Sequence, residues 1–196
     1  MPGLILASRS PRRVELLGRL GLPFETYSPD IDETCLLPAS EAVGFLSVRK
    51  ANAALARFPG CTILAADTLV SLDGVSLGKP KNAEEAVRML RRLSGKTHQV
   101  YTGVTVIGSS GEVFTETDAT NVTFASVSEE EILAYVRSGE PLDKAGAYAL
   151  QGRASLWVER LEGSDTSVIG LPLYLVRRLL IASGFPLLAR ENQNEP

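Results

Sequence analysis

Residues 4–13 read LILASRSPRR and define the first unit of the fold. The four apolar residues are typical of a buried strand, and Pro11 suits the first position of a helix, with Ser10 before it as the N-cap. The pattern therefore predicts a strand over 3–7 and a helix over 11–20. Strand and helix patterns keep alternating along the chain, which is typical of an α/β protein.

The turn between this strand and this helix also has the chemistry of an anion site. Unpaired N–H groups and the positive end of the helix dipole meet there. Ser8 and Ser10 add hydroxyl donors, and Arg12 and Arg13 can hold phosphate oxygens through forked hydrogen bonds. The structural alternative is a capped helix with a solvated basic first turn, although two arginines there oppose the dipole. The turn lacks the glycines of a P-loop, so it is not a Walker site.

Periodicity and turn signals place the remaining elements. Further strands are expected at 24–28, 61–67, 97–107, 113–124 and about 154–161, with a hairpin turn at Asp73-Gly74. Helices are expected from Ser40 to about Phe58, after the Asn82 and Ser128 caps, and from about Pro172 to Ser183. The predicted fold class is α/β, a mixed and twisted sheet flanked by helices. We expect one domain over 1–189, with two lobes around a cleft, and a disordered tail over 190–196.

Composition excludes several classes of protein. The chain has 196 residues and a formal net charge of −3, so no overall basic field draws it to nucleic acid or to an anionic membrane. No apolar run approaches the roughly 20 residues of a membrane span, and no signal-peptide pattern is present. The only cysteines, Cys35 and Cys61, have no metal-type pairing, so a reduced, cytoplasmic setting is expected. The single histidine, His98, excludes a His-rich metal site and is expected to be structural.

Carboxylates are therefore the first candidates for chemistry. Asp67 ends the apolar run 61–67 and is followed by Thr68, and open α/β sheets carry functional groups at the carboxyl ends of their strands. A turn-initiating aspartate would have the same pattern. Asp30, Asp32 and Glu33 offer oxygen ligands for a magnesium-type ion, although such a cluster is also typical of a solvated loop.

Lysines and one amide complete the candidates. Lys79 can meet a phosphate as a compact positive charge, and an exposed turn is its structural alternative. Lys50 lies on a helix where such a residue ordinarily faces water. The segment 139–152 is dense in glycine and alanine, which indicates a close approach by another strand or a ligand. Gln151 in that segment could read the edge of a base, because its amide both donates and accepts.

Five motifs in order resemble the Maf family of nucleoside triphosphate pyrophosphatases. They are SRSPRRVELL (8–17), AADTLV (65–70), GKPKNAEEAVRMLRRLSGKTHQVYTGV (78–104), SGEPLDKAGAYALQG (138–152) and GLPLY (170–174). The resemblance covers about residues 4 to 182, and it implies a Maf/ITPase-like fold with a nucleotide cleft. The form DKAGAYALQG resembles the branch acting on dTTP and UTP. One departure is visible, because SDTSVIGLP stands where the family often reads SYSNVVGLP, which changes Asp165 and Ser167.

The resemblance implies a role for each matching residue that meets the phosphates. Ser8, Arg12 and Arg13 would form the phosphate loop. Lys50 and Lys79 would complete the phosphate clamp.

The same resemblance implies the acidic and the specificity positions. Glu33 and Asp67 would lie near a divalent metal, magnesium or manganese, and Asp67 would be the proton acceptor. Arg12, Thr68 and Gln151 match positions that the family uses for substrate choice.

The implied reaction is hydrolysis of a nucleoside triphosphate to the monophosphate and pyrophosphate, as house-cleaning of the nucleotide pool by a cytoplasmic homodimer. Four substrate charges would be neutralised by arginines, lysines and the divalent ion. One alternative is a nucleotide-sensing regulator of cell division and septum formation, which would not need Asp67. Another is a hydrolase that prefers modified pyrimidine nucleotides. A nucleic-acid-binding module is the least favoured, since basic and aromatic residues do not interleave.

Overall fold

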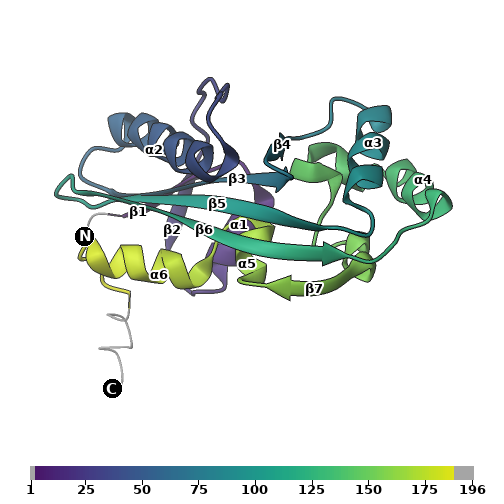
Figure 1. The fold of residues 1–196 in the computed structure, drawn as a ribbon. Coiled ribbons are helices and arrows are strands. Elements are labelled where there is room, and N and C mark those ends of the chain that lie inside the picture. Colours follow the sequence, from purple (N-terminus) through teal and green to yellow (C-terminus); the bar gives the residue numbers. More distant parts are fainter. Residues whose placement is uncertain (1–2, 188–196) are drawn as a thin grey trace, which may run out of the picture.

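The computed structural model describes residues 3–187 and has a seven-stranded mixed sheet flanked by helices (Figure 1). The strands are β1 (Leu4–Ala7), β2 (Phe24–Tyr27), β3 (Thr62–Leu72), β4 (Val75–Leu77), β5 (Thr97–Ile107), β6 (Val113–Phe124) and β7 (Val158–Glu162). Their order is β2-β1-β3-β5-β6-β7, with β4 paired to β3. The β2-β1-β3 part is parallel and the rest antiparallel. The predicted α/β class with a mixed sheet is confirmed, and the predicted tail at 190–196 lies outside the described residues.

Six α-helices and three short 3₁₀ helices connect the strands of the described range. They are α1 (Pro11–Gly18), α2 (Ala39–Arg57), α3 (Ala83–Leu93), α4 (Glu129–Arg137), α5 (Asp165–Ile169), α6 (Leu173–Ala182), η1 (Glu140–Asp143), η2 (Ala145–Ala147) and η3 (Arg153–Trp157). Within residues 3–187, no helix combines the length and the apolar character needed to cross a bilayer.

Local signals account for most of these boundaries. The capping box predicted from Ser128 and Glu131 is present, and the Asn82 side chain accepts a hydrogen bond from the Glu85 N–H. Ser10 occupies the N-cap of α1 but makes no side-chain cap. Its N–H instead donates to the Ser8 hydroxyl at 3.1 Å. The first turn of α1 is therefore organised by Ser8, the residue that follows the end of β1.

Two boundaries were predicted wrongly. The last strand begins at Val158, not near 154, because Arg153–Trp157 forms a 3₁₀ turn that places Trp157 in the core. The strand predicted to end at Asp67 continues to Leu72, so Asp67 lies within β3. The hairpin turn predicted at Asp73-Gly74 is present, because the second half of this long strand pairs antiparallel with β4.

The core has three clusters of buried residues, which form two regions at the two ends of the long strands. One region, which contains Val70, Val100 and Phe124, is covered by α3 and α4. At the other end of the sheet, α1 and α6 cover one face and α2 covers the opposite face. Figure 1 shows β3, β5 and β6 running through both ends, with α2 and α6 at one end and α3 and α4 at the other. The predicted two-lobed arrangement is thus two core regions on one continuous sheet.

Helix α2 lies in direct backbone contact with β5 at Gly103. A Cβ atom built on Gly103 would lie 2.4 Å from the carbonyl carbon and oxygen of Val43. Gly103 is also the ladder partner of Asp67. The missing side chain therefore lets α2 lie against the sheet beside Asp67, and this brings the helix residue Lys50 within reach of that carboxylate.

Candidate active site

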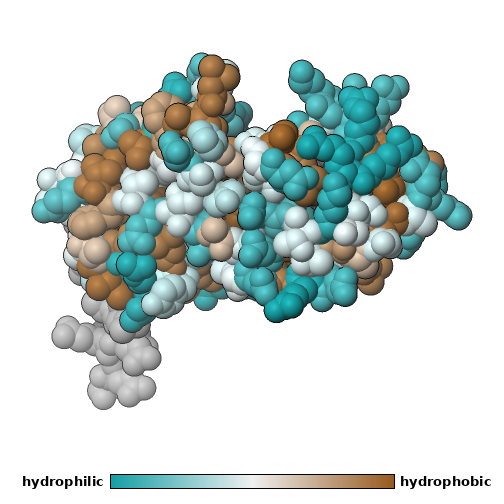
Figure 2. Space-filling view, viewed as in Figure 1, coloured by the Kyte–Doolittle hydropathy of each residue, from teal (hydrophilic) through white to brown (hydrophobic). Residues whose placement is uncertain are grey.

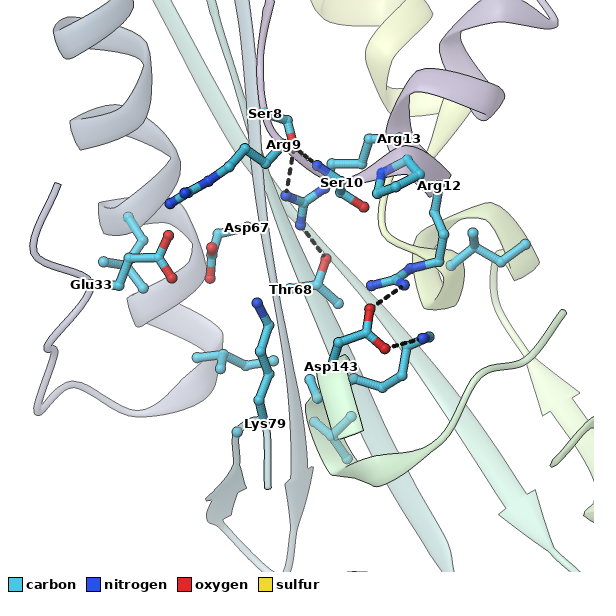
Figure 3. A pocket seen from close by; sticks show the side chains of 18 of the residues that line it. Ser8, Arg9, Ser10, Arg12, Arg13, Glu33, Asp67, Thr68, Lys79 and Asp143 are labelled. Carbon is cyan, nitrogen blue, oxygen red and sulfur yellow. Dashed lines mark hydrogen bonds and ion pairs between the residues drawn. The ribbon is translucent and has the colours of Figure 1, made fainter. Parts of the chain in front are cut away.

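A cavity of about 560 Å³ opens where the short parallel strand β1 ends and the longer β3 continues (Figure 3). All nine residues to which the family resemblance gave a role line it: Ser8, Arg12, Arg13, Glu33, Lys50, Asp67, Thr68, Lys79 and Gln151. In Figure 2 a notch in the upper outline separates the two parts of the molecule. The volume is ordinary for a pocket that binds a small molecule. The structure thus brings together residues that are spread over most of the chain.

The turn after β1 has a fixed geometry. Ser8 is 7% exposed, and its hydroxyl accepts hydrogen bonds from the Ser10 N–H at 3.1 Å and from Arg13 Nη1 at 3.4 Å. Pro11 then opens α1, so the N-terminal end of the helix faces the cavity mouth. This end of a helix favours an anion.

Arg13 joins three elements around the cavity. Its Nε donates to the Gly170 carbonyl at 2.8 Å, and its Nη2 donates to the Thr68 hydroxyl at 3.0 Å (Figure 3). Burial lowers the pKa of the Arg13 guanidinium, and the negative charge of Asp67 opposes this shift. A guanidinium keeps its charge at neutral pH even so. Arg13 is therefore a fixed positive charge in the cavity wall, held by α5 and β3.

Thr68 is part of the same network. Its hydroxyl shares a hydrogen bond with the Thr102 hydroxyl at 2.9 Å, and Thr102 in turn donates to the Ser167 carbonyl at 2.9 Å. The segment SDTSVIGLP, in which the chain departs from the family pattern, thus supports Arg13 and Thr68 through the carbonyls of Gly170 and Ser167.

Lys50 lies between two carboxylates. Its ammonium is 2.5 Å from Asp67 Oδ1 and 2.9 Å from Glu33 Oε1. Lys50 and Asp67 are 8% and 7% exposed, whereas the Glu33 side chain is 56% exposed. Lys50 does not face water, as a helix residue ordinarily would. It holds the buried carboxylate from inside the cavity.

Glu33 is kept in its charged form by this arrangement. Burial raises its pKa, but the hydrogen bond from Lys50 and the charges of Lys50, Lys79 and Arg13 outweigh burial, so the pKa lies below its ordinary value. Figure 3 shows the Lys79 ammonium directed toward Asp67, and Arg9 extending toward Glu33. The cavity therefore concentrates positive charge around two carboxylates.

The opposite wall contains residues that sequence reasoning missed. Arg12 Nη1 is 3.4 Å from Asp143 Oδ2, and Asp143 also pairs with Lys144 (Figure 3). Burial raises the pKa of Asp143, but the hydrogen bonds and charges of Lys144 and Arg12 outweigh burial, so the pKa lies below its ordinary value. Arg9 lines the cavity as well. Asp143 and Lys144 lie in the glycine- and alanine-rich segment 139–152, where an acidic residue beside a lysine is too ordinary to indicate a role.

The donor set fits a divalent ion that arrives with phosphates. Of the three acidic residues predicted as a cluster, only Glu33 lines the cavity, and Asp32 instead accepts a hydrogen bond from the Thr34 N–H. Within residues 3–187, no group of three or more His, Cys, Asp or Glu is arranged to hold a metal. Magnesium commonly takes one or two protein carboxylates and fills its other positions with phosphate oxygens and water. Glu33 and Asp67 supply that number.

The family model described as Maf-like protein matches residues 3–183. The chain belongs to the Maf family. A Myxococcus xanthus protein named dTTP/UTP pyrophosphatase is 51% identical over 186 residues, which cover 94% of this chain and 94% of that protein. A Symbiobacterium thermophilum protein of the same name is 46% identical over 189 residues, covering 95% and 97%. The Maf resemblance predicted from the motifs is confirmed.

Solved structures with a similar fold are more distant in sequence. The structure of the Staphylococcus aureus Ham1 protein covers 92% of this chain and 98% of its own, with a TM-score of 0.54 and 16% identity. A HAM1 protein from Coxiella burnetii has the same TM-score and identity, covering 93% and 100%. At this level of identity the similarity concerns the fold alone.

Proposed function

We propose that this Maf-family chain hydrolyses dTTP and UTP to the nucleoside monophosphate and pyrophosphate. One observation carries the proposal: a single cavity places a buried carboxylate, Asp67, among Arg13, Lys50 and Lys79. This arrangement combines a proton acceptor with the positive charge that a triphosphate needs. The names of the similar proteins from M. xanthus and S. thermophilum support the choice of substrates.

Hydrolysis would proceed by in-line attack of water on the α-phosphorus. The new bond joins the water oxygen to that phosphorus, and the bond to the bridging oxygen breaks as pyrophosphate leaves with the electron pair. Lys50 engages Oδ1 of Asp67, so we assign the proton released by the water to Oδ2. Arg12, Arg13 and Lys79 neutralise the leaving pyrophosphate, with the α1 N-terminus beside them.

A divalent cation, magnesium or manganese, would be held by Glu33 and Asp67 together with phosphate oxygens. When bound, it adds positive charge to the substrate phosphates. Lys50 lies between the same two carboxylates.

Base recognition is assigned to the side of the cavity that carries Gln151. Uracil and thymine present a carbonyl acceptor beside an N–H donor, and the amide of Gln151 can pair with both. Thr68 and Arg12 are assigned to substrate choice with it. The Thr68 hydroxyl is already held by Arg13 and Thr102, so its orientation is fixed before the substrate binds.

We further propose that residues 1–189 form one domain and that the protein acts as a cytoplasmic homodimer in house-cleaning of the nucleotide pool. The two cysteines support the compartment, because Cys35 and Cys61 are both free thiols, as expected in a reducing environment.

The test is release of pyrophosphate from a panel of nucleoside triphosphates, with magnesium or manganese, by the wild type and by Asp67→Asn. We expect turnover of dTTP and UTP, and a loss of at least about 100-fold in the variant with binding retained. Asp73→Asn is the matched control, because it removes the same charge from the exposed β3–β4 turn. Nucleotide binding without turnover by the wild type would overturn the proposal in favour of a nucleotide-sensing regulator.

A further inference from the structure

Gln151 belongs to a tight turn that is held at both ends. Within the turn, the Gly152 N–H donates to the Ala149 carbonyl at 3.1 Å. Gln151 is exposed and lines the cavity, so its own side chain is free to move unless the backbone beneath it is fixed. A side chain that reads a base must be held to within a fraction of an ångström by its surroundings.

Two residues outside the cavity provide this support. At the first end of the turn, the Ala149 N–H donates to the Tyr135 hydroxyl at 3.2 Å. At the other end, the Arg153 N–H donates to Glu140 Oε1 at 3.2 Å. The Tyr135 hydroxyl donates to the same Oε1 at 2.9 Å, so the two supports are joined to each other. Neither Tyr135 nor Glu140 lines the cavity.

The geometry of Gly152 indicates how closely the turn lies on this support. A Cβ atom on Gly152 would lie 1.9 Å from Glu140 Oε1 and 2.6 Å from its carboxyl carbon. Only glycine leaves room for the carboxylate to reach the backbone at this point. The contact therefore depends on two positions of the motif 138–152 at once.

The support is itself rigid. Tyr135 is 3% exposed on α4, and its ring packs edge-on against Trp157 with the centroids 4.9 Å apart. Burial raises the pKa of the Tyr135 hydroxyl, so this group stays protonated and able to donate. The Glu140 N–H donates to the Ser138 hydroxyl at 3.3 Å, which fixes the start of η1. Because α4 is packed in the core, its residue Tyr135 holds the turn in a fixed position.

We propose that Tyr135 and Glu140 are positioning residues for base recognition. They hold the turn 149–152 so that the Gln151 amide meets the 4-oxo and N3–H edge of uracil and thymine and rejects cytosine. The inference rests on the proposed function, because it assumes that Gln151 faces the base. It assigns these two residues to selectivity and not to the attack on phosphorus, since neither reaches the cavity.

The experiment measures selectivity separately from catalysis. Isothermal titration calorimetry would give Kd for the non-hydrolysable α,β-methylene analogues of dTTP and dCTP, and for inorganic tripolyphosphate. The proteins are the wild type, Tyr135→Phe, Glu140→Ala and Glu140→Gln. Glu130→Ala on the exposed face of α4 is the matched control. Steady-state kcat and KM for dTTP, dCTP and UTP would be measured in parallel.

For Tyr135→Phe and Glu140→Ala we expect the preference for the dTTP analogue over the dCTP analogue to fall about tenfold, as each loses the anchor at one end of the turn. Tripolyphosphate affinity should stay unchanged, and the kinetic loss should appear in KM more than in kcat. Glu140→Gln should keep most of the preference, because Tyr135 and Arg153 both donate to Oε1, and the Arg153 contact with Oε2 is longer, at 3.5 Å.

Two outcomes in the variants would overturn the inference. One is an unchanged preference in both variants, and the other is an equal loss for the two analogues and tripolyphosphate, as general unfolding would cause. A wild type that binds both analogues equally would also overturn it. Absence of dTTP turnover in the wild type would be seen in the kinetic assay alone and would refute the proposed function, while the binding ratios would still decide the role of Tyr135 and Glu140.

Discussion

At the scale of the residue, Lys50 controls the charge of the cavity. It is the buried cation that contacts Asp67 and Glu33, and removing one partner of a buried pair leaves the other charge uncompensated. We expect Lys50→Met to lower dTTP turnover by at least about 100-fold. The pKa of Glu33 should rise in this variant, because Lys50 supplies the largest contributions that lower it.

The measurement combines pyrophosphate release with an NMR titration of ¹³C-labelled glutamate. Arg49→Met is the control. Arg49 is next to Lys50 in α2, but its guanidinium lies over the exposed Phe45 ring, so the variant removes a positive charge from the same helix outside the Lys50 contacts. If the pKa of Glu33 is the same in Lys50→Met as in the wild type, Lys50 is not the cause of the lowered pKa.

Ser167 shows the effect of a single unpaired hydroxyl. Its Oγ is fully buried without a hydrogen-bond partner in the described structure. A buried polar group without a partner destabilises the folded state. Ser167→Ala should therefore raise the free energy of unfolding by about 1 kcal/mol and leave dTTP turnover unchanged.

Urea denaturation of Ser167→Ala, beside Ser164→Ala, checks this sign. Ser164 is the N-cap of α5 and accepts from the Ser167 N–H, so its removal should destabilise by about 1 kcal/mol. Destabilisation of both variants by the same amount would mean that the Ser167 hydroxyl has a role that this geometry does not explain.

The sequence singled out residues that line the cavity where charge occurred against local expectation. Arg12 and Arg13 in a first helical turn and Asp67 in an apolar run were visible for this reason. Asp143 was not visible, since an acidic residue beside a lysine in a loop is ordinary. Its contact with Arg12 joins positions 131 residues apart, and no local pattern encodes such a contact.

At the scale of the element, the contact of α2 with β5 leaves no room for one additional methyl group at Gly103. Gly103→Ala would place a Cβ 2.4 Å from the Val43 backbone, which cannot rotate away as a side chain could. We expect a loss of about 3 kcal/mol in the free energy of unfolding. Turnover should fall as well, because lifting α2 moves Lys50 away from Asp67.

Gly44→Ala is the matched control for urea denaturation. Its Cβ would meet the Thr117 hydroxyl at 3.5 Å, an ordinary contact, and alanine favours the helix by up to about 1 kcal/mol. Equal stability of Gly103→Ala and the wild type would show that the helix can shift at no cost.

Elements with strong periodicity or a cap were predicted from the sequence, and those fixed by tertiary contacts were not. The α4 capping box and the 97–107 and 113–124 strands have local signals. The five-residue α5 was missed, because so short a helix has no periodicity to detect. The adjacency of β3 and β5 follows from packing between distant segments, so strand order was also beyond local reasoning.

At the scale of the whole molecule, burial of His98 links folding to pH. His98 is 1% exposed, its Nε2 shares a hydrogen bond with the Tyr148 hydroxyl at 2.8 Å, and burial lowers its pKa from 6.5 to about 4. Between these two values the unfolded chain binds a proton that the folded chain does not. Stability is therefore full above pH 6.5 and falls as the pH drops toward 4.

From pH 7.5 to pH 5, this one group should lower the free energy of unfolding by about 2 kcal/mol. The check is urea denaturation at both pH values for the wild type and for His98→Gln, whose amide does not titrate. The variant should lose about 2 kcal/mol less than the wild type across this range. The same loss in both proteins would assign the pH dependence to carboxylates elsewhere.

The continuous strands β3, β5 and β6 also decide how a nucleotide can enter. A hinge between the two core regions would have to shear ladders that cross the boundary without a break, including the pairs from Ile63↔Ile107 to Ser71↔Gln99. Hinge closure across such a continuous sheet costs free energy, because it breaks backbone hydrogen bonds. Entry of the nucleotide then depends on the groups around the sheet. These are the segment 28–38, which carries Glu33, and the long side chains of Arg9, Arg12 and Lys79 at the opening. The sheet stays rigid while the side chains at the opening can change rotamer. The association rate constant of the nucleotide should therefore depend on side-chain rearrangement and not on domain rotation.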